Sequence, residues 1–173
     1  LYFDMIYYAD EWEIKNQFFY ESYENLNENA YGFSQFHDAY VIEDKVIFAT
    51  EYESDSLFAQ FQFSPSIRYT DFESGDDFIN EFFDRRDLTG PSTALDRRLL
   101  ATRAGFGYSN YDVGNYLNLG VAAMTDLTWE NGWNVVLGLR YDSVDVESTT
   151  PGGITLFGGD EDVTAEDKED GIS

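Results

Sequence analysis

Cysteine is absent from this 173-residue sequence, proline occurs only three times and histidine only once. Without cysteine there is no disulfide framework, no thiolate metal site and no cysteine nucleophile. The single histidine, His37, excludes a metal site with several histidine ligands, and we interpret it as a loop residue. No apolar run reaches about 18 residues, so no transmembrane helix is expected.

Positive charge is also scarce, because 34 acidic residues face only 10 lysines and arginines, for a formal net charge of −24. Binding to nucleic-acid phosphates needs lysine and arginine, so this balance argues against a nucleic-acid partner. The acidic run from Asp160 to Asp170 is interpreted as a solvated loop rather than a cation site. Asp71–Asp77 lacks the ligand spacing of a calcium loop. We therefore predict no metal, no cofactor and no catalytic residues.

What the sequence does contain is alternation with a period of two, most clearly between Tyr116 and Asp142. The first arm has mostly large apolar residues at every second position: Leu117, Leu119, Val121, Ala123, Thr125, Leu127 and Trp129. Glu130-Asn131-Gly132 then suits a tight turn, because asparagine and glycine tolerate a positive φ. The return arm repeats the pattern from Trp133 to Tyr141. This predicts a hairpin of two long strands with unlike faces.

Similar alternation predicts four earlier strands, for about six in all: Leu1–Tyr8, Trp12–Glu24, Tyr40–Tyr52 and Leu57–Thr70. Short turns follow the first, third and fifth strands. Long loops are expected over Asn25–Asp38, Glu73–Asn110 and Ser148–Ser173, with a possible short helix at Asp77–Phe83. Pro65 removes one backbone donor, so a bulge or a local break is expected there.

The three tryptophans separate two interpretations of this alternation. In a soluble sandwich or barrel the apolar face is the core, whereas in an outer-membrane barrel it meets lipid. Trp12, Trp129 and Trp133 each flank a short turn, so they form part of one ring if the turns lie on one side. Indole rings collect in this way at a membrane interface, being apolar with one N–H that needs water. The pattern favours the membrane barrel.

The polar positions of the same strands are expected to line a wet lumen. The candidates are Gln60, Gln62, Arg68, Asp126, Arg140 and Asp142. A charged side chain on the lipid face would cost about 2–4 kcal/mol at the midplane, which favours this assignment for the two arginines. We expect them to pair with lumen acids such as Asp126, or with a plug domain.

Two stretches resemble a known family. Leu127–Asp142, with its Trp-turn-Trp and its Gly138-Leu139-Arg140-Tyr141-Asp142 strand, resembles the barrel hairpins of TonB-dependent outer-membrane receptors, and Asn16–Ser22 resembles another strand of that barrel. The resemblance implies an antiparallel up-and-down transmembrane β-barrel with short periplasmic turns and long extracellular loops. It also implies a bacterial outer-membrane location and the lipid of that membrane as a partner.

In function, the resemblance implies uptake of a ferric siderophore or a similar scarce nutrient, with energy delivered by the TonB system through a plug. Six strands cannot close such a barrel and no signal peptide is visible, so residues 1–173 are expected to be an internal barrel fragment without a plug. An enzyme is not expected. Two alternatives stay open: a passive outer-membrane porin, and a soluble acidic β-barrel that binds a small ligand.

Overall fold

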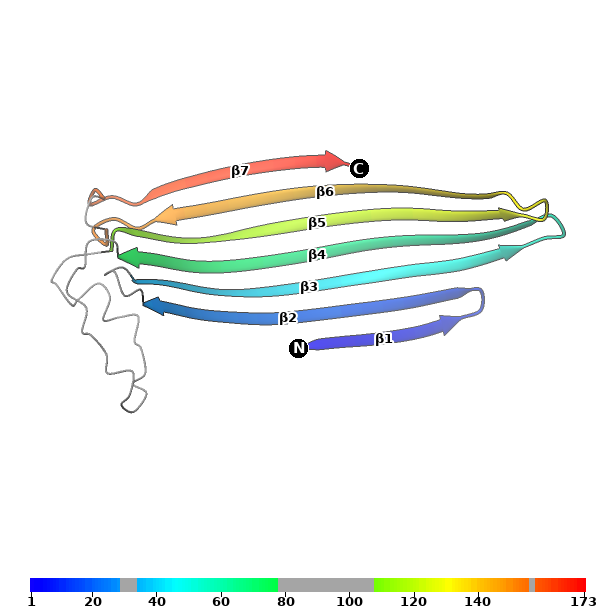
Figure 1. Ribbon diagram of the computed structural model, residues 1–173, viewed down its shortest axis with the longest axis horizontal. Helices are drawn as coiled ribbons and strands as arrows, with labels where there is room; N and C mark the ends of the chain where they lie inside the picture. Colours follow the sequence, from blue (N-terminus) through cyan, green and yellow to red (C-terminus); the bar gives the residue numbers. More distant parts are fainter. Residues whose placement is uncertain (29–33, 78–107, 156–157) are drawn as a thin grey trace.

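Seven antiparallel strands form one continuous sheet in the computed structural model, which describes residues 1–28, 34–77, 108–155 and 158–173 (Figure 1). The strands are β1 (Tyr2–Ala9), β2 (Trp12–Glu28), β3 (Ser34–Glu53), β4 (Leu57–Asp77), β5 (Asn110–Trp129), β6 (Asn134–Thr150) and β7 (Val163–Ile172). Each strand pairs with the next one along the chain, so the expected antiparallel up-and-down topology is confirmed. In the described ranges no helix is long and apolar enough to cross a membrane.

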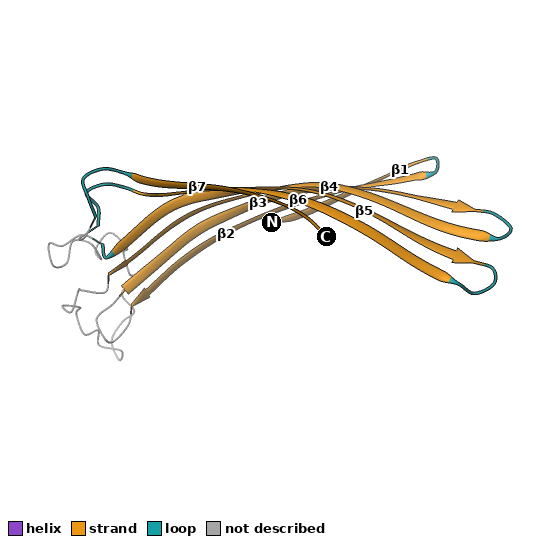
Figure 2. Cartoon of the chain, turned by 90° about the horizontal axis from the view of Figure 1, so that it is seen from above, coloured by secondary structure: helices purple, strands orange, loops and turns teal. Residues whose placement is uncertain are grey.

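The sheet is twisted and arched, and its two outer strands do not meet (Figure 2). Among the described residues no pairing joins β1 to β7, so the sheet is not closed into a barrel. The strands are long: β3, β4 and β5 have 20, 21 and 20 residues, against a usual length of about 5–6. Twenty extended residues span about 66 Å.

The prediction of a loop over Ser148–Ser173 is wrong, and the sheet has seven strands rather than about six. β6 continues to Thr150, and β7 pairs with it from Val163 to Ile172. Five charged residues in succession, 166–170, give β7 no apolar face, and this hid it from a search for alternation. Its place in the sheet comes from backbone pairing with β6 rather than from burial of apolar side chains.

Two other loops are shorter than expected. β2 and β3 extend into the predicted Asn25–Asp38 loop, to Glu28 and from Ser34, and β4 runs on to Asp77. These extensions are rich in polar side chains, so the alternation fades before the strand ends. Apart from Asp77, which ends β4, the predicted short helix lies outside the described residues.

The three short turns lie together at one end of the sheet, the right-hand end in Figure 1. Asp10 and Gly132 adopt the positive φ that such turns demand, at 49° and 88°. In the last turn the N–H of Trp129 donates to the carbonyl of Trp133 at 2.8 Å. The predicted hairpin turn is therefore confirmed.

Pro65 produces a local break in the pairing of β3 with β4, without a bulge. The register runs unchanged from Lys45 opposite Ser66 to Phe48 opposite Phe63, and only the two intervening pairs are missing. A bulge would have shifted the register by one residue. The break follows because proline has no N–H to donate.

The buried cluster among the described residues lies at the other end of the sheet. Phe36 is 1% exposed and packs edge-on against Tyr108, with ring centroids 5.9 Å apart. Leu26, Tyr111 and Ile154 pack around this pair, and the N–H of Tyr108 donates to the carbonyl of Ile154 at 3.1 Å. The cluster therefore joins the connection between β6 and β7 to the ends of β2, β3 and β5.

Replacing Gly75 with alanine should lower the free energy of unfolding by about 1–3 kcal/mol, the usual cost of overpacking. The new methyl group would lie 2.6 Å from Cε1 of Phe36, which has no free space to move into. Gly171→Ala is the matched control, since its methyl group meets nothing within 4 Å. Urea titration followed by tryptophan fluorescence compares the two, and equal loss of stability in both variants would contradict the packing described.

Candidate functional site on the two faces of the sheet

The strand register brings the alternating residues of neighbouring strands onto common faces. Thr125 lies opposite both Phe61 and Leu137, and Leu119 lies opposite Ile67. We call the side that carries these residues the apolar face and the opposite side the polar face. The apolar face includes Phe3, Met5, Tyr7, Trp12, Ile14, Phe18, Ile42, Val46, Phe48, Phe63, Val121 and Leu139.

Large side chains on the apolar face are open to the surroundings. Leu137 and Leu139 are 56% and 62% exposed, and Phe61, Ile67 and Leu119 are also exposed. Contiguous apolar patches on soluble monomers rarely exceed a few hundred Å². A face of large apolar side chains that runs across six strands marks a contact with protein or with lipid.

All three tryptophans lie at the short-turn end of the apolar face, as the sequence predicts. Trp129 ends β5 and faces Trp133 across the turn, and Trp12 begins β2. The register places Trp12 on β2 at the same level as Thr125 on β5, through Thr50 on β3 and Phe61 on β4. Trp12 therefore sits four positions nearer the middle of the sheet than Trp129.

A row of tyrosines bounds the apolar face at the other end, and sequence reasoning missed it. Tyr20, Tyr69 and Tyr141 are the last apolar residues before polar ones on β2, β4 and β6, and the ring of Tyr40 on β3 lies 6.0 Å from that of Tyr69. The signal was present in the sequence. In each of the three strands the residue two positions after the tyrosine is serine or aspartate.

Both boundaries of the apolar face cross the strands obliquely and in the same direction. Tyr20 and Tyr69 lie at one level, which is that of Asp145 on β6 and four positions further from the short turns than Tyr141. The tryptophan boundary has the same shift between β2 and β5. Four residues span about 13 Å along a strand, and three to four strand spacings span about 14–19 Å. Measured between these end residues, the apolar face is an oblique band inclined by about 35–43° from the perpendicular to the strands. The tyrosine boundary makes its shift between β4 and β6, and the tryptophan boundary makes its shift between β2 and β4.

Two polar side chains within this band contact each other. Asn16 on β2 and Asp44 on β3 interrupt their otherwise apolar rows, and the Asn16 amide donates to a carboxylate oxygen of Asp44 at 2.5 Å. A buried polar group is costly unless it is hydrogen-bonded. The contact satisfies one oxygen of the carboxylate without breaking the apolar face elsewhere.

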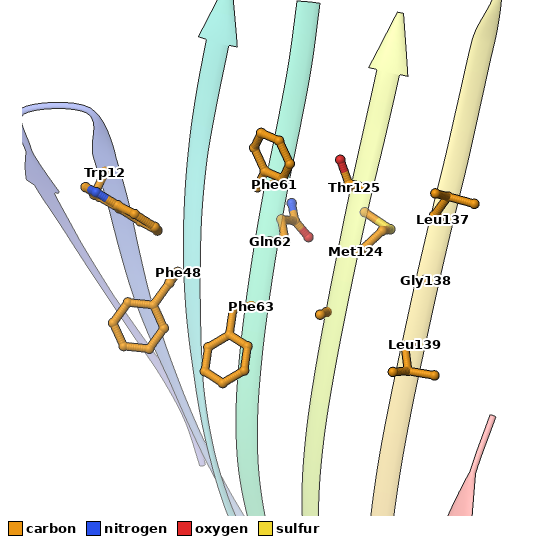
Figure 3. Close-up of a pocket in the computed structure, with 11 residues that line it drawn as sticks. Trp12, Phe48, Phe61, Gln62, Phe63, Met124, Thr125, Leu137, Gly138 and Leu139 are labelled. Carbon is orange, nitrogen blue, oxygen red and sulfur yellow. The ribbon is translucent and has the colours of Figure 1, made fainter.

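An open hollow of about 380 Å³ lies in the apolar face near the short-turn end (Figure 3). Trp12, Phe48, Phe61 and Phe63 border it on one side, and Leu137 and Leu139 on the other. The small residues Ala123 and Thr125 lie between them, which explains the depression. Its lining is predominantly apolar, as in the rest of the band.

The polar face carries all six side chains expected in a lumen. Gln60 lies opposite Asp126, Arg68 opposite Asn118, and Asp142 opposite Gly120. Gln62 and Arg140 lie on the same side of the pleat, opposite Met124 and Ala122. The structure therefore places the six residues on one face, spread over three strands rather than gathered at one point.

The two arginines pair with acids of the polar face, but not with Asp126. Arg140 makes a two-pronged contact with Asp142, in which Nε and Nη2 each lie 2.6 Å from a carboxylate oxygen. Arg68 lies 4.0 Å from Glu43 on the neighbouring strand. Asp126 instead accepts a hydrogen bond from the side-chain amide of Asn134. Asp126 lies nearer the short turns than either arginine, so it is too far from both to form an ion pair.

Gly120 lets this part of the polar face pack closely. A Cβ built at Gly120 would lie 2.7 Å from Oγ of Ser66, 3.0 Å from Oδ1 of Asp142 and 3.1 Å from Nη2 of Arg140. The arginine and its carboxylate therefore lie across β5 and approach β4. Any side chain at Gly120 would displace them.

The structure corrects the local setting of three other candidates. His37 lies in strand β3 rather than in a loop, and its side chain is exposed. Most of the acidic run from Asp160 to Asp170 belongs to β7, while Asp71–Asp77 is the end of β4. Across the described ranges no three histidine or acidic side chains come together as a metal site.

Comparison of the chain with models of known protein families, with curated proteins and with solved structures finds no match. The resemblance to TonB-dependent receptors therefore rests on the residues of the hairpin and of β2.

Proposed function

We propose that this chain forms part of the wall of an outer-membrane β-barrel that takes up a scarce nutrient, with a ferric siderophore as the representative ligand. The oblique band is the single observation that carries this proposal. Strands of membrane barrels are tilted by about 35–45° from the barrel axis, so a flat bilayer marks them with apolar boundaries inclined by that angle. The inclination of about 35–43° derived from register agrees with this tilt.

The height of the band supports the same proposal. The two boundaries are eight residues apart on β2, from Trp12 to Tyr20, and also eight apart from Trp133 to Tyr141 at β6. On β4 they are twelve residues apart, from Leu57 to Tyr69. At about 3.3 Å per residue and a tilt near 40°, these spans correspond to vertical heights of roughly 20–30 Å. The apolar band of an outer-membrane barrel is about 25 Å tall, with aromatic residues at both edges.

A soluble acidic barrel is the weaker alternative. Its core would have to cover the exposed leucines of β6 and the phenylalanines of β4 with protein. A protein core gives no reason for tryptophans along one boundary and tyrosines along the other. A bilayer does, because both side chains prefer the interface between hydrocarbon and water.

Uptake of a bound nutrient is proposed ahead of passive diffusion for two reasons. The hairpin Leu127–Asp142 resembles TonB-dependent receptors, and the strands are much longer than the band. A membrane strand needs about 9–11 residues, whereas β3 and β4 have 20 and 21. On this proposal the excess lies on the extracellular side and forms a tall mouth, in which a ligand can bind before the TonB system drives it past a plug.

Arginine at Leu119 should impair assembly into lipid vesicles. The expected cost is below the value of about 2–4 kcal/mol for the midplane, because Leu119 lies two residues from the tyrosine boundary. Arginine at the adjacent Asn118 should have little effect, because that side chain lies on the polar face. Leu137→Arg and Phe61→Arg test the apolar face on other strands, with Gln62→Arg as their control. Assembly yields on gels that separate folded from unfolded barrel measure the difference, and equal tolerance of the two faces would refute the proposal.

The three indoles should lie at one depth in the bilayer. With strands perpendicular to the membrane, Trp12 would be about 13 Å deeper than Trp129, but with strands tilted as proposed the two depths coincide. Variants that keep a single tryptophan, with phenylalanine at the other two positions, can be quenched by phospholipids brominated at different chain positions. Strong quenching of Trp12 by deep bromines alone would contradict the tilt.

Cells that carry this protein should accumulate labelled ferric siderophore under iron limitation, and cells that lack it should accumulate less. Collapse of the inner-membrane proton gradient should stop this uptake, because the proposed route needs energy from that membrane. Uptake that continues after the gradient is collapsed would favour the passive porin instead. Absence of any difference between the two cell lines would remove the siderophore from the proposal.

A further inference from the structure

Among the residues that the structure describes, positive charge is concentrated on one face of the sheet. The described residues include five lysines and arginines, and four of them, Lys15, Lys45, Arg68 and Arg140, lie on the polar face. The four also lie close together along the strands. Lys15 and Arg140 lie at the same level of the sheet. Lys45 lies two residues further from the short turns than this level, and Arg68 lies four residues further. The fifth, Lys168, lies on β7.

Two of these four cations are already neutralised by close partners. Lys15 forms an ion pair with Asp4 at 3.1 Å. Nε and Nη2 of Arg140 each donate to a carboxylate oxygen of Asp142. Exposed ion pairs of this kind contribute little to stability, but they balance the charge without any ligand. They therefore account for two of the four positive charges.

Lys45 and Arg68 are different, because their donors are largely unused. Among the described residues no hydrogen bond or ion pair involves the Lys45 ammonium, and Arg68 has only the 4.0 Å contact with Glu43. The Arg68 side chain is 48% exposed. A guanidinium has five donors and an ammonium has three, so most of them are available to a ligand.

The register also places these two like charges near each other. Lys45 on β3 lies opposite Ser66 on β4, and Ser66 is two residues from Arg68 on the same face. Diagonal neighbours in a sheet have Cα atoms about 7–8 Å apart, within reach of long side chains. Glu43 supplies one negative charge to the two cations, which leaves the group with a surplus of one positive charge.

We propose that Lys45, Arg68 and the hydroxyl of Ser66 form a binding site for an anionic group, a carboxylate or a phosphate, of a solute that enters the lumen. Charge-assisted hydrogen bonds from a guanidinium and an ammonium are the strong ones available to such oxygens. Gly120 lies directly beyond Ser66 and adds no side chain. The inference relies on the proposed function only for the statement that the polar face encloses solvent.

The full chain in detergent micelles should bind citrate, and inorganic phosphate serves as the second probe to distinguish carboxylate from phosphate. Lys45→Gln and Arg68→Gln should each weaken citrate binding about tenfold, since a hydrogen bond to a charged group is lost. Lys168→Gln is the matched control and should bind as the unchanged chain does. Calorimetric titration at low salt measures all four proteins, and equal binding by all four would overturn the site.

A footprint on the unaltered chain removes any dependence on how the variants fold. Citrate should slow acetylation of Lys45 severalfold, as followed by mass spectrometry, while Lys15 and Lys168 should react at unchanged rates. Equal protection of all three lysines, or none, would overturn the proposal. If Leu119→Arg assembles normally but Lys45 is protected, the membrane function fails and the anion site stands. If membrane assembly behaves as proposed but Lys45 is not protected, only the anion site fails.

Discussion

A single uninterrupted register is the constraint on which the rest of this structure depends. From β1 to β7 every strand keeps one alignment with its neighbour, even where Pro65 removes a donor. A slip of one residue would turn a whole strand over and move its apolar side chains to the other face. Because no slip occurs, six separate alternating patterns combine into one apolar face and one polar face.

The sequence determines the central part of this arrangement well. The hairpin around Asn131-Gly132 combines strict alternation with a turn that tolerates a positive φ, and both are local signals. The pairing within each hairpin is also predictable, because a short turn forces the two strands that it joins to be neighbours. The facing of Arg68 and Arg140 followed from the alternation alone.

The sequence determines the ends of the strands poorly, and the reason is physical. Outside the oblique band neither face is continuously apolar, so the alternation that identifies a strand disappears while its backbone pairing continues. β7 was missed for this reason, and so were the outer parts of β2, β3 and β4. Cross-strand partners such as Asn16 with Asp44, or Arg68 with Glu43, depend on register between strands and cannot be read from one strand at a time.

In the outer-membrane barrel wall that we propose, the inclination of the band also decides which parts of the wall lie above one another. Over a height of about 25 Å, a tilt near 40° carries a strand sideways by roughly 21 Å, about three neighbouring strands. The outer end of β2 therefore stands above the inner ends of strands further along the wall, not above the turn of its own hairpin. A movement at one extracellular tip would reach the periplasmic rim at a point displaced around the circumference, so the two rims are connected along a spiral.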